Sequence, residues 1–250
     1  MKIDAIDVSY VGHVCFCFCS PGGAVLLTDP LFASGFMWEG HREDYLSPPA
    51  VSLKGLGRCD CVFVTHEHGD HFDPKAVLTV LDRTDAHVVA PAEVLETLAR
   101  EGAESGRFLE AREGDGFTFG DLRLSTYCGY DDSFDPQGRP NKFSAIIESG
   151  AARLFYSGDC HDIPPALKGT EVDAMLCWPH TDPLRLEALC AGLKAQRFVI
   201  MHCDRFAPGD FMCNMDPEKE AKRVRRAAPS MEVIAPERIE QWPPCAAGGW

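Results

Sequence analysis

The stretch CVFVTHEHGDHFDPKAVL, residues 61 to 78, decides how this chain folds and what it does. A run of apolar residues that favour strands leads directly into three histidines, a glutamate and an aspartate within six residues. The run predicts a buried strand, and Asp73 followed by Pro74 predicts the capped first turn of a helix. Five ionisable side chains between a buried strand and a helix indicate a functional site rather than a solvated loop.

Alternation along the strand separates the side chains of this group. Residues two apart at the end of a strand project to the same side, so His66 and His68 are expected to share one space and Glu67 to point away. A sharp turn at the next glycine would let Asp70 and His71 face a neighbouring position. Imidazole nitrogens suit zinc, and carboxylates extend the choice to iron or manganese. The segment therefore predicts ligands for two adjacent metal positions.

Length and charge limit the number of domains and the kinds of partner that this chain can have. A chain of 250 residues with 45% hydrophobic residues predicts one α/β domain spanning residues 1–250. The net charge of −14 argues against a nucleic-acid partner, because binding to a phosphate backbone relies on clusters of lysine and arginine. No apolar run is long enough to insert into a membrane. The sequence leaves the oligomeric state open, a homo-oligomer included.

The first residues and the cysteines predict a cytoplasmic, reduced protein. Asp4 and Asp7 stand where an export signal would carry an apolar run. The twelve cysteines are scattered, which does not suggest a disulfide scaffold in a chain of this size. Cys15, Cys17 and Cys19 have strand alternation and are expected to be buried on one face.

Strands and helices are predicted along most of the chain. Strands dominate the first thirty residues, residues 31–56 are expected to be a long functional loop, and the C-terminal tail is expected to be poorly ordered. Helices are predicted after Pro74, Pro183 and Pro217 and in AEVLETLAREG, residues 92–102. This pattern alone is compatible with two packed sheets or with one doubly wound sheet.

At this point the sequence resembles a known family. THEHGDH, residues 65–71, matches the HxHxDH signature of the metallo-β-lactamase fold superfamily of metal-dependent hydrolases. LLTDP supplies an early aspartate, Asp29, LFYSGD supplies a metal-bridging Asp159, and FVIMH supplies a final histidine, His202. The resemblance implies a four-layer αββα sandwich in which His66, His68, Asp70, His71, Asp159 and His202 hold one or two divalent ions, zinc above manganese or iron.

The opening YVGHVCFCF, followed by LLTDPLF, points to one branch. It is similar to the branch that includes L-ascorbate-6-phosphate lactonase and N-acylphosphatidylethanolamine phospholipase D. The resemblance places His13 near the site, either behind a ligand or against substrate. Asp29 would hydrogen-bond a ligating histidine and fix its tautomer.

One departure from the family concerns a further histidine ligand between the HxHxDH segment and the Gly-Asp. By the resemblance, Asp131 falls where that histidine is expected and would replace it as an oxygen ligand. Asp132 or Cys128 are alternatives, and so is a vacant position. An oxygen donor there would favour manganese or iron over zinc.

The resemblance implies a cytoplasmic metal-dependent hydrolase acting on a small-molecule lactone or phosphate ester. Asp70 would be the catalytic residue that also moves a proton. His161 and His180 follow strands and could reach the substrate. Arg205 would either neutralise an anionic substrate or be a plain surface arginine. Phe36 and Trp38 would either wall the pocket or pack the loop down. The alternatives are a phosphodiesterase acting on a lipid or nucleotide, and a metal-binding relative without catalysis.

Overall fold

The structure, a computed structural model, describes residues 1–128, 138–179, 182–207 and 215–248. Two of the predicted site residues, Asp131 and His180, lie outside these ranges, as does the alternative Asp132. Within the described ranges the chain forms two seven-stranded sheets and one three-stranded sheet. No helix in these ranges has the length and apolar character needed to cross a bilayer.

The first large sheet is built from the N-terminal half of the chain. Its strands pair antiparallel from β1 to β4 and parallel from β4 to β9. In spatial order they are β1 (Lys2–Ile3), β2 (Ile6–Gly12), β3 (Cys15–Cys19), β4 (Val25–Thr28), β7 (Cys61–Phe63), β8 (His87–Ala90) and β9 (Phe108–Glu110).

The second large sheet follows in the chain and has the same change of direction. Its strands pair antiparallel from β10 to β13 and parallel from β13 to β17. In spatial order they are β10 (Gly116–Phe119), β11 (Leu122–Cys128), β12 (Phe143–Ser149), β13 (Ala152–Tyr156), β14 (Glu171–Cys177), β15 (Lys194–Ile200) and β17 (Glu232–Ile234).

The helices begin where the sequence predicts. The Asp73 carboxylate accepts hydrogen bonds from two backbone N–H groups of the first turn of α1, and Asp182 and Asp216 do the same for α3 and α4. Each cap is followed by a proline, whose missing N–H costs nothing at that position. The helices are α1 (Pro74–Arg83), α2 (Ala92–Arg100), α3 (Pro183–Gly192) and α4 (Pro217–Ala227).

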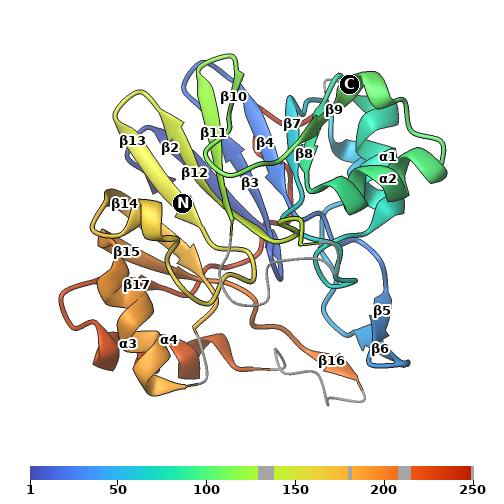
Figure 1. Cartoon of the computed structure of the whole chain (residues 1–250). Helices are drawn as coiled ribbons and strands as arrows, with labels where there is room; N and C mark the ends of the chain where they lie inside the picture. The colour runs from blue at the N-terminus through green and yellow to red at the C-terminus, as the bar shows by residue number, and fades with distance from the viewer. Residues whose placement is uncertain (129–137, 180–181, 208–214, 249–250) are drawn as a thin grey trace.

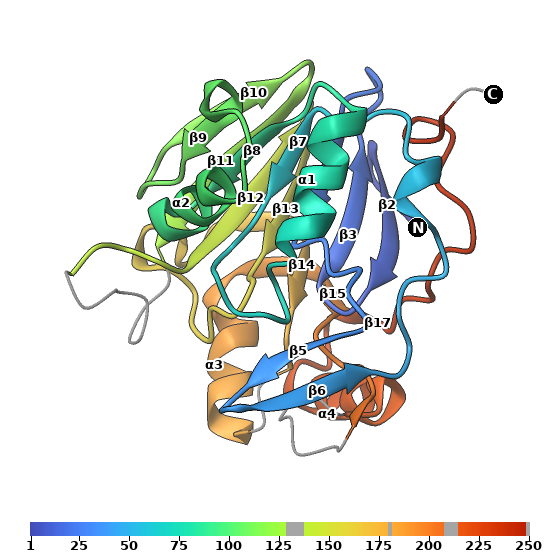
Figure 2. The same cartoon turned by 90° about the vertical axis from the view of Figure 1, so that its right-hand side faces the viewer.

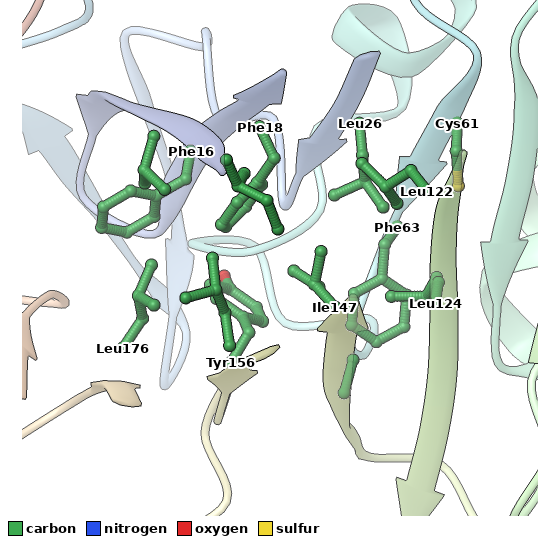
Figure 3. Close-up of a cluster of buried hydrophobic side chains, with 14 of the residues drawn as sticks. Phe16, Phe18, Leu26, Cys61, Phe63, Leu122, Leu124, Ile147, Tyr156 and Leu176 are labelled. Carbon is green, nitrogen blue, oxygen red and sulfur yellow. The ribbon is translucent and has the colours of Figure 1, made fainter. Parts of the chain in front are cut away.

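The elements stack in four layers, as the resemblance implied. Helices α1 and α2 cover one sheet and α3 and α4 cover the other (Figures 1 and 2). Between the sheets, Phe16, Phe18 and Phe63 of the first sheet face Ile147 and Tyr156 of the second (Figure 3). Burial of this apolar surface holds the two sheets, and hence their ends, in a fixed relation.

Two expectations about irregular segments are wrong. Residues 31–56 are not a structureless loop: β5 (Gly35–Trp38) and β6 (His41–Tyr45) form a hairpin, to which β16 (Phe206–Ala207) adds a third strand. The prediction of a poorly ordered tail is also wrong for the described residues up to 248. Trp242 and Ala246 are buried in the cluster beneath α1 and α2.

The cysteines match the expectation only in part. Cys15 and Cys17 are buried in the core on one face of β3, as predicted. Cys19, on the same face, forms a disulfide with Cys245 of the tail. The prediction of a fully reduced chain is therefore wrong at this pair, because the tail returns across β3, which no local pattern reveals.

Candidate metal centre

The predicted site residues come together at one end of the two sheets. Asp29 follows β4, His66 follows β7, Asp159 follows β13 and His202 follows β15. All four strands belong to the parallel parts of their sheets. The carboxyl ends of parallel strands meet at one edge, which brings segments more than 170 residues apart in sequence together.

Four donor atoms form a compact first donor group, made of Asp70, His71, Asp159 and His202. Nε2 of His71 and Nε2 of His202 are 2.8 Å apart. Oδ1 of Asp159 lies 2.9 Å from the former and 3.0 Å from the latter. Oδ2 of Asp70 lies 3.1 Å from Nε2 of His202 and 3.6 Å from Nε2 of His71. Two carboxylates and two imidazoles thus aim one atom each at a common point.

A second donor group, made of His66, His68 and Asp159, adjoins the first. Oδ2 of Asp159 lies 3.3 Å from Nε2 of His66 and 3.7 Å from Nδ1 of His68. The two imidazole rings are 4.4 Å apart, as expected for side chains that project to the same side. Asp159 therefore presents one oxygen to each donor group.

The donor types and their surroundings fit a divalent cation. Oδ1 of Asp70 is buried and accepts no hydrogen bond from any described residue, a costly state for a carboxylate oxygen without a further partner. Imidazole nitrogen and carboxylate oxygen are ligands for zinc and for harder metals. Two sets of three side chains place one donor atom each within 4.8 Å of one another: His13, Asp70 and His202, and His66, His71 and Asp159.

Charge and burial push the pKa values of neighbouring histidines in opposite directions. Burial, followed by the nearby His71, lowers the pKa of His66 to about 4. Burial also lowers the pKa of His71, but Asp159, Asp70 and Asp29 outweigh it and raise that pKa to about 10. Without metal, His71 thus holds a proton at neutral pH while His66 is a neutral donor.

Metal binding should therefore release a proton from His71. A ligating imidazole nitrogen must be deprotonated, and this nitrogen keeps its proton up to a pKa of about 10. Below that pKa the proton competes with the ion, so metal affinity should rise about tenfold per unit between roughly pH 7 and pH 9. Calorimetric zinc titrations in buffers of different ionisation enthalpy measure the proton count. An affinity that stays flat over this range would contradict the protonation assigned to His71.

Asp29 anchors the first donor group from behind. Its carboxylate, fully buried, accepts hydrogen bonds from the backbone N–H of Thr65 at 2.7 Å and from the hydroxyl of Tyr156 at 2.7 Å. Oδ2 also lies 2.9 Å from Nδ1 of His71, which directs Nε2 of that ring toward Asp159. The contact between Asp29 and a histidine is the one that the resemblance implies, and the role of His71 as a ligand stays a prediction. No sequence pattern indicated Tyr156, whereas Thr65 directly precedes the HxH pattern.

The backbone is strained where it carries the site. Asp29, His13 and His202 have positive φ angles of 34°, 54° and 61°, in a backbone region that residues other than glycine rarely adopt. Such strain persists only where the surrounding contacts enforce it. The backbone N–H of His202 donates to the carbonyl of His13 at 2.9 Å, so two of these strained turns hold one another.

Gly158, directly before Asp159, should not tolerate a side chain. Its φ is 52°, and a Cβ would lie 2.7 Å from Cγ2 of Thr65. Gly158→Ala should lower the free energy of unfolding by about 2–4 kcal/mol, combining backbone strain with overpacking. Gly150→Ala is the matched control, because its φ is 60° and nothing lies within 4 Å of the added Cβ. Urea unfolding compares the two, and equal losses would contradict the assigned clash.

Aromatic and imidazole side chains surround the donor groups. The ring of Trp38, in β5, lies 6.1 Å from that of His68. The ring of His161 lies 5.0 Å from that of Trp178, which in turn lies 5.5 Å from that of His202. His161 thus contacts Trp178, whose ring also lies beside His202.

Other predicted residues are exposed, buried in a hydrophobic cluster or outside the described chain. The side chains of Glu67 and Arg205 are exposed. Phe36 is buried in a hydrophobic cluster and lies against Gly69 of the HxHxDH segment. No described contact places Arg205 against a donor atom. The predicted roles of Asp131 and His180 fall on residues outside the described ranges.

Comparison with known proteins places these features in a family. The family model of the beta-lactamase superfamily domain matches residues 25–203. The chain belongs to the beta-lactamase superfamily. The matched segment contains every residue of both donor groups, and the prediction of family and fold is confirmed.

Members of this superfamily with similar sequences include proteins named as metal-dependent hydrolases. A UPF0173 metal-dependent hydrolase of Rubrobacter xylanophilus is 31% identical over 158 residues, which cover 61% of this chain and 60% of that protein. One of Methanosphaera stadtmanae is 23% identical and covers 62% of each chain. The chain thus spans about three fifths of the length of these curated relatives.

Solved structures share the fold over nearly the whole chain. Igni18, a metallo hydrolase from Ignicoccus hospitalis, superposes with a TM-score of 0.66 at 20% identity and covers 93% of this chain and 95% of its own. The metallo-beta-lactamase fold protein YhfI of Bacillus subtilis has a TM-score of 0.61 at 15% identity, covering 94% and 99%. At these identities the likeness concerns the fold.

Proposed function

We propose that this protein is a metal-dependent hydrolase that uses a metal-activated water on a small-molecule lactone or phosphate ester. The observation that carries the proposal is the position of Asp159, whose two oxygens face two adjoining groups of imidazole nitrogens. The printed names of the curated relatives support a hydrolase.

In this proposal Asp70, His71, Asp159 and His202 hold one divalent ion, and His66, His68 and Asp159 hold a second. A bound ion of this kind lowers the pKa of water toward neutrality and polarises the oxygen of the bond under attack. Zinc suits the imidazole-rich second group best, and manganese or iron are alternatives if Asp131 completes it with oxygen. One or two ions per chain are compatible with these donors.

The chain's own residues orient the reactants and move the proton. Oδ1 of Asp70 accepts no hydrogen bond from a described residue, and Oδ2 of the same carboxylate faces the first donor group, so we assign Oδ1 as the acceptor for the proton of the attacking water. The water oxygen forms a bond to the carbonyl carbon or phosphorus, the ester bond breaks, and Asp70 passes the proton to the leaving oxygen. Asp29 holds the ring of His71 in a fixed orientation during these steps.

The β5–β6 hairpin favours an apolar group beside the reacting bond. Trp38 stands next to His68, and Phe36, two residues before it in β5, lies against Gly69 of the HxHxDH segment. An apolar wall of this kind also suits a phosphodiester of a lipid, which is the second candidate substrate. Both substrates need the same ions and the same attacking water.

Metal analysis with a substrate panel tests the proposed function. Protein purified without chelators should contain about one or two equivalents of zinc, manganese or iron, as expected for sites of this donor type. It should hydrolyse at least one member of a panel of lactones, phosphomonoesters and lipid or nucleotide phosphodiesters, and chelation should abolish the turnover. Asp70→Asn is the matched variant: it binds the first ion more weakly, and even at saturating metal it should lose most activity, because the amide cannot accept the proton. Bound metal without turnover on the whole panel would favour a non-catalytic relative.

A further inference from the structure

His13 lies closer to the first donor group than the resemblance implied. It occupies the turn between β2 and β3, and its side chain is completely buried. Its Nε2 lies 3.5 Å from Oδ2 of Asp70, the same oxygen that faces His202. The rings of His13 and His202 are 4.4 Å apart, and their backbones are joined by a hydrogen bond of 2.9 Å.

The other ring nitrogen of His13 faces a second buried carboxylate. Oδ2 of Asp204 lies 3.8 Å from Nδ1 of His13. Asp204 is 8% exposed, accepts a hydrogen bond from the hydroxyl of Tyr45 at 2.7 Å, and pairs with the guanidinium of Arg238. Tyr45 lies in β6 and Arg238 in the C-terminal segment, so distant parts of the chain fix this carboxylate.

The two carboxylates flank the two ring nitrogens of His13. A neutral imidazole has one N–H and one lone pair. Without metal, Nε2 hydrogen-bonds to Oδ2 of Asp70 at 3.5 Å, and Oδ2 of Asp204 lies 3.8 Å from Nδ1. If Nε2 gave its lone pair to an ion, the proton would have to move to Nδ1, where it would face Asp204. A carboxylate behind one nitrogen with the other nitrogen facing a metal position is the usual arrangement of ligating histidines.

We propose that His13 is a further protein ligand to the ion that Asp70 and His202 hold in the first donor group, and that Asp204 orients its imidazole. One donor atom from each of the three residues lies within 4.8 Å of the others. The proposal rests on the proposed metal centre and adds to it a ligand that the HxHxDH, Gly-Asp and final histidine elements do not contain. The strained φ of 54° at His13 is the backbone cost of aiming this ring inward.

Cobalt binding to a cavity variant tests the proposal. His13→Gly suits the positive φ and leaves a space that free imidazole fits. In a titration of metal-free protein with Co²⁺, His13→Gly should bind one ion at least about 10–100-fold more weakly than wild type, and the visible ligand-field bands should shift. Millimolar imidazole should restore both the affinity and the spectrum. His87→Gly, at the opposite end of the first sheet, is the control and should change neither.

A second variant keeps the test decisive if His13→Gly does not fold. Asp204→Asn replaces the charged acceptor that faces Nδ1 with a neutral amide, so Co²⁺ affinity should fall roughly 10–100-fold while the bands stay close to those of wild type. A folded His13→Gly protein with unchanged bands, whatever its affinity, would overturn the proposal, and so would wild-type affinity in Asp204→Asn. If wild-type protein itself binds no Co²⁺, the proposed metal centre fails and not this inference alone.

Discussion

Asp159→Asn should yield a folded protein that retains little metal and no measurable hydrolysis. The side chain supplies one oxygen to each donor group, and an amide offers one neutral oxygen in place of a charged, two-oxygen carboxylate. The loss of metal affinity should exceed the roughly 10–100-fold seen when an outer partner of a ligand is changed. Metal content after dialysis, measured beside turnover, gives the result.

The matched control is Asp162→Asn, three residues farther along the same segment and in neither donor group. It should keep both the metal and the activity of wild type. Circular dichroism should give the same spectrum for both variants. If Asp159→Asn kept wild-type metal content, the shared-carboxylate arrangement would be wrong, whatever the activity.

Asp29→Ala should cause the largest loss of stability among single changes at the site. Asp29 is completely buried, and its removal takes the acceptor from the N–H of Thr65 and the negative charge from beside His71. Tyr156 and His71 would keep only the carbonyl of Val14 and the hydroxyl of Thr65 as partners. Removing one partner of a buried charge network costs about 3–5 kcal/mol. Urea unfolding of the metal-free protein measures this cost directly.

Asp29→Asn separates charge from shape at the same position. Asparagine tolerates the positive φ of 34° and keeps one acceptor oxygen, so the loss should be smaller than for alanine. Both variants should also weaken zinc binding, because the ring of His71 loses the group that directs it. A loss below about 1 kcal/mol in Asp29→Ala would show that the carboxylate does not anchor the site.

The parts of the fold that the sequence could predict are those set by local rules. The Asp73-Pro74 cap is a local signal, and α1 begins at Pro74. The alternation of His66 and His68 is equally local, and their rings share one side. The packing of two sheets against each other was predicted only from the family resemblance, since the strand patterns alone were also compatible with one doubly wound sheet.

The parts that could not be predicted depend on contacts between distant segments. β16, more than 160 residues later in the chain, pairs with β6. Residues 31–56 alone do not show the alternation of a strand with one buried face, so this sheet was not predicted. The tail is fixed by the stacking of Trp242 on Phe32 and by the Cys19–Cys245 disulfide. Such pairings leave no periodicity in the local sequence.

The same reason explains the residues missed at the site. Asp204 is two positions past His202, yet nothing in MHCDRF shows that its carboxylate faces His13. Tyr156 reads as one more buried residue of a strand, and its hydroxyl bond to Asp29 appears only when the two sheets are packed together. The candidate ligands have a sequence signature here, whereas of the groups that orient them only Asp29 has one.

The most direct test of the central claim is a crystal structure of the protein soaked in Zn²⁺, with anomalous data collected at the zinc absorption edge. An anomalous peak should appear between Oδ1 of Asp159, Nε2 of His71 and Nε2 of His202, about 2.0–2.2 Å from each. Ordered protein at saturating zinc with no peak among these atoms would contradict the assignment of a metal centre to this end of the sheets.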